Sequence, residues 1–167
     1  MSTTYDWSRF VTRVNINAPM EKLYWCWATK EGIECWFLRR SDYKKPGGSL
    51  LAKDEFVKKG DSYSWWWHGY SDDVVEQGEI MDCNGKNHFK FRFGNAGICT
   101  VNIYEEQNER IVELIQEQIP TDEKAKQNWH LGCKTGWTFY LANLKSLLEG
   151  GIDLRNKNEK IQNVITS

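Results

Sequence analysis

The chain has 167 residues, of which 40% are hydrophobic and 27% are charged, and its formal net charge is −1. We expect one domain over residues 1–167 with a short tail at 151–167. The balanced charge argues against nucleic-acid binding, and no apolar run reaches the ~20 residues that a membrane-inserted helix needs. Aromatic residues make up 14% of the chain, including nine tryptophans, which predicts a core or a cavity wall built from rings.

The cysteines are scattered along the chain and form no C-x-x-C pair. An odd number of isolated cysteines is more typical of reduced thiols than of a disulfide framework. The N-terminus also lacks the pattern of a secretory signal. These features predict a cytoplasmic protein. The five positions are Cys26, Cys35, Cys83, Cys99 and Cys133.

The beginning of the chain predicts a strand followed by two short helices. Residues 9–17, RFVTRVNIN, alternate between apolar and polar side chains, as a half-buried strand does. The next segment, APMEKLYWCWA, places Pro19 at the first helical position and Glu21 in the first turn. A second short helix is expected around residues 31–36.

The middle of the chain has a period of two and predicts an antiparallel meander. Turn signals, such as NG at residues 84–85 and GNAG at residues 94–97, separate several of the segments. The lysine-rich segment 53–61 is expected to be a loop. The candidate strands lie at residues 37–43, 62–70, 74–82, 87–93, 98–105 and 110–119.

The end of the chain predicts one long amphipathic helix. Thr121 is a good N-cap, and apolar or small side chains then recur at helical spacing until Gly150. A helix of about 28 residues is about 42 Å long, enough to cross a whole sheet. Because an antiparallel sheet needs one apolar face covered, we expect an α+β fold in which a curved sheet wraps around this helix.

Space tends to remain between a straight helix and a curved sheet, and ligand pockets favour such sites. Strand alternation and helical spacing turn a set of rings toward this space, either as plain core or as the wall of a cavity. Trp66 alternates to the outer surface, where an exposed ring marks a contact with a partner protein. The expected cavity residues are Tyr63, Trp65, Trp67, Phe89, Phe91, Trp129, Cys133, Trp137 and Tyr140.

Two glycines, Gly132 and Gly136, interrupt the predicted buried face of the long helix. Glycine costs about 1 kcal/mol relative to alanine in a helix interior, so something should compensate. Either the sheet approaches closely at these positions, or the missing side chains leave room for a ligand. We favour close packing.

The sequence shows no arrangement typical of catalysis or of metal binding. His68, His88 and His130 do not have the spacing of metal ligands. Cys133 is interpreted as a small core residue and not as a nucleophile activated by His130. No phosphate-binding glycine loop is present. We therefore expect no cofactor, no metal and no catalytic residue, and the leading hypothesis is non-catalytic binding of a small hydrophobic or aromatic molecule.

The segment APMEKLYWCWATKEGIECWF, residues 18–37, is similar to the opening of proteins related to the C-terminal domain of the heat-shock protein 90 ATPase activator. Residues 78–93 resemble the central hairpin of that family, and the likeness extends over roughly residues 9–153. The matching positions are Ala18–Pro19, Glu21, Leu23–Tyr24, Glu31 and Trp36–Phe37 near the start, and Gly136–Trp137, Leu141, Leu144, Leu148 and Gly150 in the closing helix.

The resemblance implies the helix-grip fold of the START-like, polyketide-cyclase and pollen-allergen superfamily, in which a hydrophobic ligand such as a lipid commonly lies between sheet and helix. It also implies two alternatives. One is a chaperone-associated module, connected with the stress response, that binds protein near Trp66. The other is a cyclase- or hydrolase-type enzyme, which needs polar groups such as His130 or Asn102 inside the cavity.

Three departures limit what this resemblance transfers. Residues 51–63 do not follow the family pattern, which leaves the strand register around residues 51–70 open. The eukaryotic activator has a separate N-terminal domain for which this chain has no room, and this argues against chaperone activation. The matching residues are structural, so they transfer a fold and not a reaction.

Overall fold

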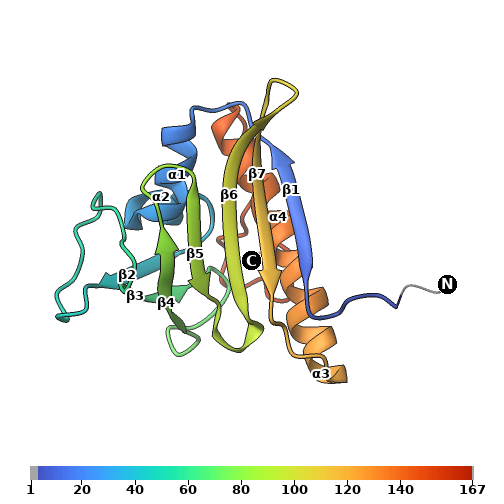
Figure 1. Ribbon diagram of the computed structural model, residues 1–167. Coiled ribbons are helices and arrows are strands. Elements are labelled where there is room, and N and C mark those ends of the chain that lie inside the picture. The colour runs from blue at the N-terminus through green and yellow to red at the C-terminus, as the bar shows by residue number, and fades with distance from the viewer. Residues whose placement is uncertain (1–3, 167) are drawn as a thin grey trace.

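The computed structural model describes residues 4–166 (Figure 1). The strands are β1 (Phe10–Asn15), β2 (Arg40–Lys44), β3 (Ser62–Trp66), β4 (Glu76–Cys83), β5 (His88–Arg92), β6 (Ile98–Glu106) and β7 (Glu109–Glu117). The helices are α1 (Met20–Ala28), α2 (Lys30–Trp36), a short 3₁₀ turn η1 (Gly94–Ala96), α3 (Glu123–Ala125), a π-helical segment η2 (Lys126–Leu131) and α4 (Gly132–Leu148).

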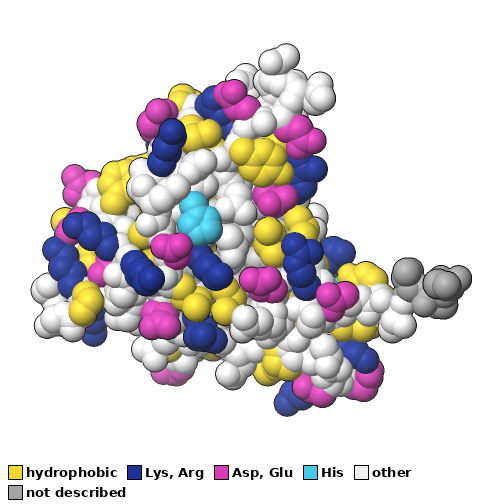
Figure 2. Space-filling model, viewed as in Figure 1, with side chains coloured by type: hydrophobic (Ala, Val, Ile, Leu, Met, Phe, Trp, Pro, Cys, Tyr) yellow, Lys and Arg dark blue, Asp and Glu magenta, His cyan; other side chains and the backbone are white. Residues whose placement is uncertain are grey.

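The strands form one antiparallel sheet in the order β1-β7-β6-β5-β4-β3-β2. The sheet curves, and the long C-terminal helix runs along its inner face, behind β6, β7 and β1 in Figure 1. The α+β helix-grip fold expected from the sequence is confirmed. Its outer face carries basic and acidic side chains side by side, without a large patch of one sign (Figure 2).

All the helices and strands expected from the sequence are present, but several of them begin or end at other residues than predicted. The first meander strand begins at Arg40 and not at residue 37, because Phe37 still has helical backbone angles at the end of α2. β3 ends at Trp66, four residues before the predicted end of that strand. The long helix is capped by the side chain of Asp122, which accepts a hydrogen bond from the Ala125 amide at 3.1 Å, and not by Thr121.

The register around residues 51–70 is settled by pairing on both sides of β3. Tyr63 lies opposite Tyr43 of β2 and opposite Gly78 of β4. Gly78 permits a close approach, since a side chain there would collide with the Arg92 carbonyl and with the Tyr63 ring. Residues 53–61 form a loop, as expected.

The core lies between the inner face of the sheet and the helices, and rings dominate it. Trp27 and Trp36 are fully buried and meet edge to face at 4.7 Å between ring centroids. From the long helix, Trp137, Leu141 and Leu144 are buried against the sheet. Most of the aromatic content of the sequence therefore serves packing, which holds the curved sheet and the helix together.

The segment after α4 returns to α2 and is anchored there by one buried cation. The Arg155 guanidinium donates to the carbonyl oxygens of Glu34 at 3.0 Å, Cys35 at 2.7 Å and Leu38 at 3.0 Å, which lie at the C-terminal end of α2. It also pairs with Asp153 at 2.7 Å. These bonds satisfy carbonyls that the end of a helix otherwise leaves without partners.

Candidate ligand pocket

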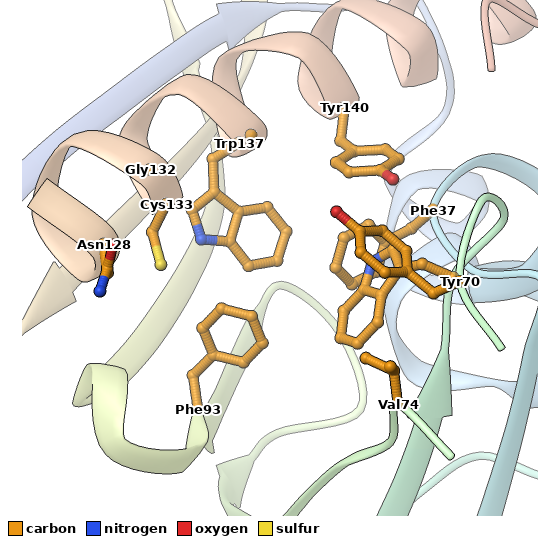
Figure 3. A pocket seen from close by; sticks show the side chains of 11 residues that line it. Phe37, Tyr70, Val74, Phe93, Asn128, Gly132, Cys133, Trp137 and Tyr140 are labelled. Atoms are coloured by element: carbon orange, nitrogen blue, oxygen red, sulfur yellow. The ribbon is translucent and has the colours of Figure 1, made fainter. Parts of the chain in front are cut away.

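A pocket of about 250 Å³ lies between the helix and one end of the sheet (Figure 3). Antiparallel topology brings the end of α2, the β3–β4 loop and the end of β5 to this place, and α4 covers them. Rings make up most of the lining, and none of the lining side chains carries a formal charge. The lining residues are Phe37, Trp67, Tyr70, Val74, Phe93, Asn128, Gly132, Cys133, Gly136, Trp137 and Tyr140.

Phe37 and Trp137 form the inner wall of the pocket. Their rings stack at 4.8 Å between centroids, and Phe37 meets Tyr140 edge to face at the same distance. Phe93 packs on Trp137 from the sheet side at 5.6 Å. Because these rings brace one another, the wall is preformed.

The indole of Trp137 is held in place by a buried amide. Its Nε1–H donates to Gln116 Oε1 at 2.9 Å, and Gln116 Nε2 donates to the carbonyl of Ala96 at 2.8 Å. Gln116 is fully buried, so this arrangement satisfies polar groups that would otherwise be costly. The indole is thereby fixed with its ring, and not its N–H, toward the pocket.

The two helix glycines lie on the pocket, which corrects our preference for close packing. A Cβ atom at Gly136 would meet nothing within 4 Å, and one at Gly132 would meet only the Gln127 carbonyl, at 3.5 Å. The sheet does not press against the helix at these positions. The missing side chains leave space there, which is the alternative that the sequence left open.

The structure divides the expected cavity residues into two groups. Trp67, Cys133, Trp137 and Tyr140 line the pocket. The others do not line it: Tyr63, Trp65, Phe89 and Phe91 are buried in the core behind it, and Trp129 is partly buried against that core.

Several lining residues were missing from the expected set. Phe37 was assigned to a strand, although it ends a helix. Tyr70 and Val74 were assigned to the end of one predicted strand and the start of the next, but both lie in the β3–β4 loop. Phe93 continues the inward alternation of Phe89 and Phe91, a signal that was available in the sequence.

The β3–β4 loop, residues 67–75, is held by contacts on the outer side of the sheet. Arg39 pairs with Asp72 at 2.6 Å and donates to the Trp67 carbonyl at 3.2 Å. Trp66 lies on the outer face, half-buried, with its indole N–H donating to the Asp72 carbonyl at 3.0 Å. The guanidinium of Arg40 covers the Trp66 ring at 4.1 Å. Trp66 therefore has a structural role in anchoring the loop that carries Tyr70 and Val74.

The polar groups considered for catalysis do not meet in the pocket. His130 is buried and faces the N-terminal segment, where Nε2 lies 2.8 Å from the Tyr5 hydroxyl and Nδ1 lies 2.8 Å from the Trp7 carbonyl. Asn102 lies 2.9 Å from His88 Nδ1 through its side-chain oxygen. Burial raises the pKa of the Cys133 thiol, which disfavours the nucleophilic thiolate.

Within residues 4–166, no group of three or more histidine, cysteine or acidic side chains is placed to hold a metal ion. No helix in this range is both long enough and apolar enough to cross a membrane.

A family model described as "Activator of Hsp90 ATPase homolog 1-like protein" matches residues 17–149. No curated protein gives a significant match to the chain. The matched residues contain α1, α2, six of the seven strands and the whole long helix up to its end.

Solved structures share the fold at low sequence identity. The protein SSP2350 from Staphylococcus saprophyticus superposes with a TM-score of 0.67 at 20% identity, over 88% of this chain and 96% of that one. The Aha1 dimer from Colwellia psychrerythraea gives 0.63 at 16% identity, over 86% and 97%. The protein MLL2253 from Mesorhizobium loti gives 0.64 at 16%, over 85% and 97%. At these sequence identities, the similarity between this chain and the solved structures shows a shared fold only.

Proposed function

The chain belongs to the Activator of Hsp90 ATPase homolog 1-like protein family, and from that premise we propose that it binds a small hydrophobic or aromatic molecule in the pocket beside α4. The observation that carries the proposal is the uncharged, ring-rich lining at a place where two helix glycines leave space. Trp67, Cys133, Trp137 and Tyr140 are the binding residues of this proposal that the sequence also indicated.

Affinity at such a site comes from apolar burial, about 25 cal/mol per Å² removed from water, and from stacking on the rings. The pocket volume of about 250 Å³ lies just below the range of about 300–1,000 Å³ that is typical of ligand pockets. This favours a small ring system over a long acyl chain. The lining offers no carboxylate, imidazole or amine, so the proposal is one of binding without catalysis.

The experiment is equilibrium dialysis of the full chain against naphthalene, with two matched variants of α4. Gly136→Leu fills the pocket, because position 136 faces open space on its lining. Ala142→Leu adds a leucine to an exposed position of the same helix that does not line this pocket. We expect saturable binding by the wild type and by Ala142→Leu, and at least tenfold weaker binding by Gly136→Leu. Absence of binding by the wild type, or equal binding by both variants, would contradict the proposal.

A second candidate is a chaperone-associated protein-binding module, which the family description favours. Its contact surface would include Trp66 and the covering Arg40 on the outer face. The test uses purified Hsp90 and measures its binding and its ATPase rate with wild type, Trp66→Ala and Trp25→Ala. Trp25 is the matched control, a partly buried ring that Lys22 covers at 3.8 Å. Loss of binding in Trp66→Ala alone is expected; equal behaviour of the two variants would argue against this surface.

With either candidate function, we propose that the protein is cytoplasmic and that residues 1–167 form a single domain. The chaperone candidate adds a connection with the stress response. The cysteines support the location, because all five are free thiols in the structure.

A further inference from the structure

Tyr140 differs from the rest of the pocket wall because it brings a polar atom to it. Its side chain projects from α4, and the residue is only 6% exposed. Phe37 meets its ring edge to face at 4.8 Å, and Phe139 lies against it at 5.0 Å. These contacts fix the ring, so the hydroxyl has one direction, along the pocket wall (Figure 3).

Within residues 4–166, the Tyr140 hydroxyl makes no hydrogen bond, and its oxygen is not fully enclosed by the protein, so it is open to the pocket that Tyr140 lines. A ligand that fills the pocket would displace water from this hydroxyl. A ligand atom that accepts a hydrogen bond there would avoid the free-energy cost of leaving the hydroxyl without a partner. The other buried tyrosines all have partners: Tyr24 accepts from the Gly85 amide at 3.1 Å, Tyr43 accepts from Trp65 Nε1 at 3.2 Å, and Tyr63 donates to the Arg92 carbonyl at 2.5 Å.

A second phenol lies on the same side of the pocket. Tyr70, on the β3–β4 loop, is 55% exposed at the rim, and Figure 3 shows its hydroxyl turned toward Tyr140. Among the described residues it too has no hydrogen-bond partner. One phenol is therefore fixed by packing, and the other is at the solvent edge, where it is free to follow a bound molecule.

The charge around this pair of phenols limits what they bind. The buried cation Arg155 is already paired with Asp153 and with backbone carbonyls, and none of the lining side chains is charged. Burial raises the pKa of Tyr140, so its hydroxyl stays protonated and keeps its donor at neutral pH. A charged group on the ligand would lose its water here without gaining a counter-ion, which is costly.

Resting on the proposed function, we propose that the ligand is an uncharged aromatic molecule with a hydroxyl or carbonyl oxygen at one end, and that this oxygen hydrogen-bonds to Tyr140, with Tyr70 beside it at the rim. The rings of the pocket hold the flat part of the molecule. Tyr140 selects for the oxygen, which makes it a specificity-determining residue.

The test is equilibrium dialysis with three probes that share one ring system: naphthalene, 2-naphthol and 2-naphthoate. The variant is Tyr140→Phe, which removes only the hydroxyl. The matched control is Tyr104→Phe, because Tyr104 lies on β6 outside the pocket and bonds to Glu113 at 3.1 Å. A net hydrogen bond corresponds to about a fivefold change in affinity. We expect wild type and Tyr104→Phe to bind 2-naphthol about fivefold more tightly than naphthalene, and 2-naphthoate more weakly than either.

In Tyr140→Phe, the preference for 2-naphthol over naphthalene should disappear while the affinity for naphthalene stays unchanged. Equal binding of the two probes by wild type, persistence of the preference in Tyr140→Phe, or tightest binding of 2-naphthoate would overturn this inference. Any of these results leaves the proposed function standing as long as naphthalene binds. If none of the probes binds to the wild type, the proposed function fails, and this inference fails with it.

Discussion

The space beside Gly136 makes an unusual prediction, that Gly136→Ala stabilises the fold. Alanine is favoured over glycine in a helix interior by about 0.8–1.0 kcal/mol. The whole of this difference should add to the free energy of unfolding, because a Cβ at this position meets nothing within 4 Å. For a chain of this size, 1 kcal/mol raises the melting temperature by about 2–4 °C. The same methyl group projects into the pocket and should weaken naphthalene binding.

The assay is urea unfolding of wild type and Gly136→Ala, followed by tryptophan fluorescence, together with dialysis against naphthalene. Gly132→Ala is the companion variant, since its Cβ would make an ordinary contact of 3.5 Å with the Gln127 carbonyl, and it should also stabilise. A lower stability of Gly136→Ala would refute the reasoning, because it would mean that the sheet does press against the helix there. Higher stability with unchanged binding would place the ligand elsewhere.

Three other outcomes are expected from urea unfolding. Gly78→Ala should lose about 1–3 kcal/mol, because the new methyl group collides with the Arg92 carbonyl. Asp153→Asn should lose about 2 kcal/mol at pH 7. Burial raises the pKa of Asp153, but hydrogen bonds from Arg155 and Lys157 outweigh this effect and lower the pKa below 3.8. The difference in unfolding free energy between Asp153→Asn and wild type should therefore shrink as the pH falls below that value. Burial raises the pKa of Glu76 above 4.5, so Glu76→Gln should be the more stable protein at pH 7 and equal to wild type below pH 4.5.

The order and type of the elements followed from periodicity in the sequence. The alternation in RFVTRVNIN predicted β1, and the helical spacing up to Gly150 predicted the long helix. The curved sheet around that helix then followed from the need to cover one apolar face. These features are local or nearly local, so the sequence alone contains them.

The ends of the elements were less accessible because they depend on competition between neighbours. Phe37 has a β-favouring side chain, yet its backbone amide still bonds to the Ile33 carbonyl and completes α2. Likewise, Trp67 continues the alternation of β3, but the strand ends at Trp66. Long-range contacts decide where a helix or strand ends, and the pattern of apolar and polar residues along the chain does not contain these contacts.

The sequence by itself determined that rings lie between the sheet and the helix; only the tertiary structure decided which of them border empty space. Trp65 and Trp67 have the same pattern and the same chemistry, yet Trp65 is fully buried and Trp67 lines the pocket. Gly136 was equally compatible with contact and with a gap. The reason is that a cavity is a property of the distance between surfaces, and this distance is set by how the curvature of the whole sheet meets the helix and not by any residue alone.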